Sequence, residues 1–149
     1  MWFNKENPNT VFMDKKKKIE DFSHSKLNVR MSPDIQAVWE YLPFPDETFE
    51  MVVFDPPHMI ENRPLDCNSI FVSKYGLLRP QTYRRELFQA GKEFWRVLKK
   101  GGFLVFKWND CSRKFDRVIQ YFPNRPLFYQ KSKGSAGQSS TFWAVFQKT

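Results

Sequence analysis

The sequence predicts an α/β fold built on a largely parallel sheet. Short apolar segments of strand length alternate along the chain with segments of helical or loop character, and no internal repeat is present. Residues 49–54 are apolar apart from Glu50 and end at two prolines, which is typical of a buried central strand. Residues 83–98 carry apolar side chains at spacings of three and four, which indicates an amphipathic helix beside the sheet.

The other elements follow from local signals. Thr82 suits the N-cap of the long helix, and residues 99–102 suit its end because lysines favour the negative end of the helix dipole and glycine allows a left-handed cap. A short helix is expected at residues 113–121. Further strands are expected at residues 10–13, 27–31, 103–108, 126–129 and 141–147.

Length and composition indicate one globular domain, spanning residues 1–149. Hydrophobic residues make up 41% and aromatic residues 17%, which argues against disorder. No apolar run is long enough to cross a bilayer, and the first residues lack the apolar stretch of a signal peptide. We therefore expect a cytoplasmic protein with no membrane partner, whose two cysteines are reduced and bind no metal.

The net charge of +8 suits a polyanionic partner such as nucleic acid. The lysine run at residues 15–18 could contact phosphate, although such a run is more often a solvated loop. The polar, proline-interrupted stretch at residues 59–80 is too long for an ordinary connection, which indicates a functional loop. Four basic residues in or near it are candidates for contact with the nucleic-acid backbone, namely Lys74, Arg79, Arg84 and Arg85.

The sharpest local signal is the motif Asp55-Pro56-Pro57-His58 at the end of the central strand. The Asp55 carboxylate and the Pro56 carbonyl can both accept hydrogen bonds from an exocyclic amino group, which aims the nitrogen lone pair outward. His58 offers a flat face on which a base could stack. The alternative is a strand-ending turn in which Asp55 bonds nearby backbone.

Polar residues also follow other expected strands. Asp14, Asp34, Asp55 and Asn109 would all lie at the carboxyl edge of a parallel sheet if helices connect the strands. Ligands bind at that edge in open α/β sheets. The sequence therefore predicts a binding site there.

Several stretches together resemble the class I S-adenosylmethionine-dependent methyltransferases that methylate amino groups. The likeness is carried by the Asp-Pro-Pro motif and by the order and spacing of further segments, and it is greatest to small enzymes of phages and prophages, which work in the cytoplasm of a bacterial host. These further segments are residues 7–14, 34–37, 42–49, 94–102, 106–109 and 141–146.

The resemblance implies a Rossmann-like sheet with helices on both faces and S-adenosylmethionine as the cofactor. It implies that Asp14 binds the cofactor ribose, that Asp34 and Ile35 bind its adenine, and that Asp55 lies beside it. The implied reaction is methylation of an exocyclic amine of a flipped DNA base, and the amine that the resemblance favours is N6 of adenine. Asp14 could instead belong to a solvated charge cluster, and Asp34 could cap a helix.

The chain departs from the family pattern in two respects. His58 stands where the family usually has tyrosine, phenylalanine or tryptophan, so stacking on a base would be weaker. No glycine precedes Gly76, so we expect an N-terminally shortened sheet without the first strand and the glycine-rich cofactor turn. Self-association or a partner subunit could complete such a sheet.

Three functions remain open on the sequence. The first is a DNA amino-methyltransferase. The second is a methyltransferase-like module that binds nucleic acid or protein without catalysis, which the expected loss of the turn favours. The third is an enzyme acting on a small molecule or a protein, which the basic charge makes less suitable.

Overall fold

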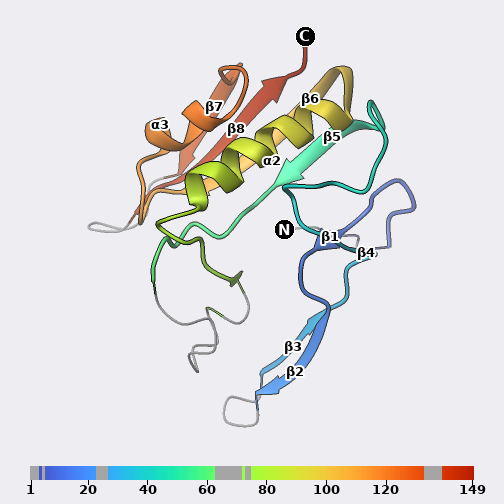
Figure 1. Ribbon diagram of the computed structural model, residues 1–149, viewed down its shortest axis with the longest axis vertical. Helices are drawn as coiled ribbons and strands as arrows, with labels where there is room; N and C mark the ends of the chain where they lie inside the picture. The colour runs from blue at the N-terminus through green and yellow to red at the C-terminus, as the bar shows by residue number, and fades with distance from the viewer. Residues whose placement is uncertain (1–3, 5, 23–26, 63–71, 73–74, 133–138) are drawn as a thin grey trace.

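A mixed four-stranded sheet forms the body of the computed structural model, which describes residues 4, 6–22, 27–62, 72, 75–132 and 139–149 (Figure 1). The strand order is β5-β6-β8-β7; β5 runs parallel to β6, and the other neighbours are antiparallel. The strands are β5 (Phe49–Phe54), β6 (Leu98–Asn109), β7 (Phe128–Ser132) and β8 (Thr141–Gln147).

The long helix α2 (Tyr83–Val97) connects the two parallel strands and packs along the sheet (Figure 1). All of its predicted apolar stripe is buried, which confirms the amphipathic helix. Thr82 is the N-cap residue, as predicted, but its side chain makes no capping hydrogen bond.

The end of this helix differs from the prediction. The helix ends at Val97, and Leu98 is already extended and pairs with Phe49 as the first residue of β6. Residues 99–102 therefore belong to the strand, where the pairing with β5 is irregular. Gly101 does adopt the left-handed conformation, with a φ of 81°, but it serves this irregularity and does not cap the helix.

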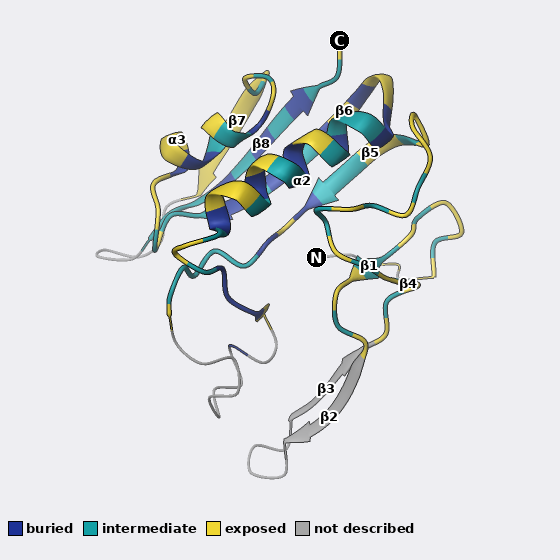
Figure 2. Ribbon diagram, in the orientation of Figure 1, coloured by how far each residue is buried: buried dark blue, intermediate teal, exposed yellow. Residues whose placement is uncertain are grey.

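The core lies between the sheet and its helices. Phe106 and Trp108 of β6 pair with Ala144 and Phe142 of β8. These alternate residues of the two strands therefore point to the same side of the sheet. The short helices α3 (Phe115–Val118) and η1 (Ile119–Tyr121) cover this side too, and the Phe115 ring stacks on Phe142 at 4.4 Å. Figure 2 shows the buried side of α2 turned toward the strands.

The predicted α/β class is confirmed. The strands expected at residues 49–54 and 141–147 have the predicted bounds, and residues 103–108 lie inside the longer β6. The prediction that residues 49–54 form a buried central strand is wrong for the described residues, because β5 lies at the edge of the sheet and only Phe54 of it is buried. The strand expected at residues 126–129 lies a little later, as β7. Of the helices expected on both faces, those in the described residues pack on one face of the sheet, the face of Phe106 and Phe142.

The N-terminal part forms two further pairs of strands. Strand β1 (Met13–Asp14) pairs in parallel with β4 (Ile35–Gln36), and β2 (Lys18–Phe22) forms an antiparallel hairpin with β3 (Leu27–Met31). The hairpin extends away from the main sheet (Figure 1). Asp14 and Asp34 were expected to share one parallel sheet with Asp55 and Asn109 if helices connect the strands. That condition is not met, because a hairpin connects β1 to β4 and these two strands form a separate sheet.

No helix in the part of the chain that the structure describes is long and apolar enough to cross a membrane.

Candidate functional site

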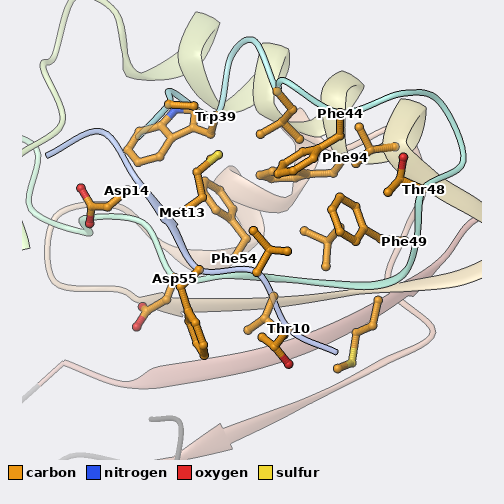
Figure 3. A pocket seen from close by; sticks show the side chains of 18 of the residues that line it. Thr10, Met13, Asp14, Trp39, Phe44, Thr48, Phe49, Phe54, Asp55 and Phe94 are labelled. Carbon is orange, nitrogen blue, oxygen red and sulfur yellow. The ribbon is translucent and has the colours of Figure 1, made fainter. Parts of the chain in front are cut away.

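A pocket of about 780 Å³ follows the outer edge of β5 (Figure 3). On that edge, β5 has no partner strand among the described residues, and residues 9–16 form the opposite wall. The lining consists of residues 9–16 and 48–55 together with Ala37, Trp39, Leu42, Phe44, Pro57, Tyr75, Gly76, Phe94, Val97 and Lys99.

The two ends of this pocket differ in chemistry. Figure 3 shows the carboxylates of Asp14 and Asp55 toward one end and the rings of Phe44 and Phe49 toward the other. Between them, Trp39 packs edge to face on the Phe54 ring, with 5.5 Å between ring centroids. The indole nitrogen of Trp39 is buried and has no hydrogen-bond partner among the described residues. The pocket thus offers flat apolar surface and, at one end, acidic groups.

Asp55 is held by Lys107, a residue of the neighbouring strand. Because Phe54 pairs with Phe106, the next residues of the two strands lie side by side, and Lys107 Nζ donates to Asp55 Oδ2 at 2.9 Å. Both side chains remain about one third exposed, at 29% for Lys107 and 32% for Asp55. This bond reaches across strands, and the described contacts of Asp55 include none to nearby backbone, which the turn alternative would require.

Sequence reasoning did not assign Lys107 a role. Its stretch, residues 106–109, was included in the family resemblance, and a lysine within an apolar strand was a visible signal. Only the register between β5 and β6, however, shows that Lys107 lies opposite the motif.

The rest of the motif lies close to the pocket, and one part of it lines the pocket. Pro57 is a lining residue, and Gly76 packs against it: a Cβ on Gly76 would lie 3.4 Å from Pro57 Cγ. Pro56 is buried, and His58 is partly buried; neither is among the lining residues. Burial lowers the pKa of His58, and Lys107 adds to this while Asp55 opposes it. The imidazole is therefore neutral at pH 7.

The acids expected to bind a cofactor have different surroundings. Asp14 lines the pocket, and its carboxylate accepts the Lys16 backbone N–H at 2.8 Å. Asp34 is not a lining residue; its carboxylate accepts the Phe12 backbone N–H at 2.8 Å, which fixes β4 against the segment before β1. Ile35 lies outside the lining as well. The helix-cap alternative for Asp34 is wrong, because strand β4 follows it.

An ion network that sequence reasoning missed holds the segment of residues 42–46 against α2; Leu42 and Phe44 of this segment line the pocket. The Arg96 guanidinium bonds the carboxylates of Glu93 and Asp46 at 2.8 and 2.9 Å and the carbonyls of Leu42 and Phe44 at 3.0 and 2.7 Å. Glu93 also accepts the Leu42 backbone N–H. The Arg96 hydrogen bond and this backbone bond lower the pKa of Glu93 despite its burial. The spacing of Glu93 and Arg96 on one helix face was the available signal.

The predicted nucleic-acid contacts lie in several places. Lys74 falls outside the described residues. Arg79 contacts the Glu61 carbonyl at 3.4 Å, Arg85 is exposed on α2, and Arg84 bonds the Tyr83 hydroxyl. Of the lysine run, Lys15 and Lys16 line the pocket, and the side chain of Lys18 is not described. Of the described basic residues named here, Lys15 and Lys16 are the ones that line the same pocket as Asp55 and Pro57 of the motif.

Comparison with known proteins gives structural likeness but no sequence relative. No protein-family model matches the sequence, and no curated protein matches it. The fold is similar to the crystal structure of the N-methyltransferase NodS from Bradyrhizobium japonicum WM9, with a TM-score of 0.50, 14% identity, and coverage of 76% of this chain and 58% of NodS.

A second solved structure is similar, a S-adenosylmethionine-dependent methyltransferase from Methanosarcina mazei. The TM-score is 0.45 at 13% identity, with coverage of 75% of this chain and 65% of that one. The chain thus matches less than two thirds of the length of either structure. At 14% identity the comparison with NodS shows the fold alone. Over three quarters of its length, this chain has the Rossmann-like α/β fold of a methyltransferase.

Proposed function

We propose that this chain is an S-adenosylmethionine-dependent methyltransferase that acts on an exocyclic base amine of DNA, with N6 of adenine as the preferred acceptor. The observation that carries the proposal is the Asp55 carboxylate, which lies at the end of strand β5, is held by Lys107 and lies at one end of a pocket. In the described contacts, Lys107 bonds the Oδ2 atom of Asp55. The Oδ1 atom is therefore available to an amine. The fold shared with an N-methyltransferase supports the same reaction class.

The pocket residues fit the adenosine part of the proposed cofactor. Met13 and Trp39 offer apolar surface for a purine. The exposed Asp14 carboxylate can accept hydrogen bonds from ribose hydroxyls. When bound there, S-adenosylmethionine would supply an activated methyl group.

Asp55 would position the acceptor. Its Oδ1 can accept one N–H of the amine and the Pro56 carbonyl the other, which leaves the nitrogen lone pair aimed at the methyl carbon. Lys107 fixes the carboxylate from the other side, so the amine meets a group already held in place. If the nitrogen takes the methyl group and the cofactor leaves as S-adenosylhomocysteine, the amine loses one proton, which Asp55 would accept and pass to water.

Two further features support a nucleic-acid acceptor. The neutral His58 ring, next to the two prolines, can stack on an unpaired base. The net charge of +8 favours association with a polyanion.

The proposal is tested by transfer of tritium from methyl-labelled S-adenosylmethionine. Duplex DNA, single-stranded RNA and free adenosine serve as acceptors, and the wild type is compared with Asp55→Ala and Asp116→Ala. Asp116 is the matched control, because it is an exposed aspartate on α3.

We expect transfer to DNA that falls by on the order of 100-fold or more in Asp55→Ala and is unchanged in Asp116→Ala. Thermal melts establish that the variants are folded. Retained activity in folded Asp55→Ala would contradict the role of Asp55. DNA binding without transfer by the wild type would favour the binding module, and transfer only to free adenosine would exclude a DNA acceptor.

A further inference from the structure

Two arginines from separate segments converge on the hydroxyl of Tyr83. Arg84 Nε, at the start of α2, and Arg113 Nε, in the loop after β6, each donate to Tyr83 Oη at 3.2 Å. Both guanidinium groups also lie over the Tyr83 ring, at 5.7 and 5.8 Å from its centroid. Tyr83 itself is only 3% exposed, so a rigid core residue holds two exposed cations close together.

This cluster carries positive charge that its neighbours do not neutralise. Within the described part of the chain, no carboxylate forms a salt bridge with either arginine. Burial would raise the pKa of the Tyr83 phenol, but hydrogen bonds from Arg84, Arg113 and Tyr121 outweigh it and lower that pKa. The surroundings of this oxygen therefore stabilise negative charge.

Contacts between loops place the cluster beside the Asp-Pro-Pro-His motif. The Ser112 hydroxyl accepts the Ile60 backbone N–H at 3.1 Å, and the Cys111 thiol contacts the His58 carbonyl at 3.6 Å. Arg113 directly follows these two residues. The loop that presents Arg113 is thus fixed to the segment that continues from Asp55.

From this geometry we infer that Arg84 and Arg113 form a binding site for one backbone phosphate of a nucleic acid. Each guanidinium makes few of its five possible hydrogen bonds here: Arg84 uses Nε, and Arg113 uses Nε and one bond from Nη1 to the Ser112 carbonyl. The remaining N–H groups match phosphate oxygens, which guanidinium groups bind in bidentate fashion. A phosphate here would anchor the strand next to the motif.

The inference rests on the nucleic-acid acceptor of the proposed function but does not require methyl transfer. It is tested by the affinity for a short DNA duplex, measured by fluorescence anisotropy at several salt concentrations without cofactor. The variants are Arg84→Gln, Arg113→Gln, their combination, and Tyr83→Phe, which keeps the buried ring. Arg125→Gln combined with Lys100→Gln is the matched control, because both side chains are exposed; Lys100 lies near the start of β6 and Arg125 near the end of β8, whereas Arg113 follows the end of β6.

If both arginines hold one phosphate, the combined variant reduces the slope of log affinity against log salt by about 1. The two single substitutions are then not additive, Tyr83→Phe weakens binding less than the combined variant, and the control keeps the wild-type slope. An unchanged slope in the folded combined variant, or an equal loss in the control, would overturn the inference. If the wild type binds no DNA at low salt, the inference fails, whereas methyl transfer to free adenosine can still be measured.

Discussion

The two walls of the pocket are built in different ways. The wall of β5 belongs to the main sheet, and below it the Phe54 ring packs on Trp39, Phe94 and Phe106. The wall of residues 9–16 depends on the two-residue strand β1 and a few hydrogen bonds, such as the one from the Phe12 backbone N–H to the Asp34 carboxylate. Asp55, which we propose positions the amine, is therefore on a rigid element, and Asp14 is on a segment held mainly by local contacts.

This difference suits the proposed chemistry. An amine that attacks a methyl group must be placed within a fraction of an ångström, and such placement requires groups locked by packing. Binding of an adenosine by hydroxyl and stacking contacts tolerates more adjustment. We therefore expect substitutions in the two walls to have unequal effects on stability.

The largest effect is expected from the core beneath the β5 wall. Phe106→Ala removes a fully buried ring that contacts Phe54, Trp108 and Phe122, so it should lower the free energy of unfolding by about 3–5 kcal/mol. Urea denaturation monitored by circular dichroism measures this value. A loss below about 1 kcal/mol would show that the sheet is not the rigid part of the molecule.

A smaller effect is expected from the network between α2 and residues 42–46. Arg96→Met removes bonds to two carboxylates and two carbonyls, and we expect a loss of about 2 kcal/mol in the free energy of unfolding. The same denaturation experiment checks it, with Arg125→Met as an exposed control. Equal stability of the two variants would mean that the network does not hold residues 42–46 against α2.

The wall of residues 9–16 should respond locally. Asp34→Ala removes the acceptor of the Phe12 amide, which should cost about 1 kcal/mol. Hydrogen exchange should accelerate at the Phe12 amide and remain unchanged at the amides of β6. Faster exchange throughout β6 would erase the proposed contrast between the two walls.

The pH dependence of Glu93 gives the smallest effect. Because the pKa of Glu93 is lower in the folded protein than its ordinary 4.5, the unfolded chain binds the proton more readily. The stabilisation by Glu93 is therefore complete above pH 4.5 and is lost as the pH falls through the lowered value. Thermal melts of the wild type and Glu93→Gln should differ most above pH 4.5 and converge in more acidic buffer. A difference that grows on acidification would contradict the sign.

Local patterns predicted the elements of the main sheet, and long-range pairing decided what the patterns could not. Strand β8 and the buried face of α2 follow from apolar periodicity, which is a local property. Residues 27–31 form a strand as expected, but nothing local to them shows that they pair with residues 18–22. The hairpin returns the chain so that β4 pairs with β1, where Asp34 lies against Phe12 and outside the pocket lining.

The candidate site shows the same division. Asp55 was identified from its own motif, whereas its partner Lys107 lies more than fifty residues later and is brought to it by register. Arg113 likewise meets Tyr83 and Arg84 only through the packing of the loop after β6. The local motif was enough to identify Asp55, whereas the residue that holds it could be identified only from the folded chain.

The central claim is that Asp55, held by Lys107, positions a base amine for methylation. It is tested most directly by mass spectrometry of N6-methyladenine in DNA digested after incubation with S-adenosylmethionine and either the wild type, Asp55→Asn, Lys107→Met or the double variant. We expect product from the wild type, a rate reduced on the order of 10-fold to 100-fold in Lys107→Met, and no further loss when Lys107→Met is added to Asp55→Asn. N6-methyladenine formed at the wild-type rate by folded Asp55→Asn would contradict the claim.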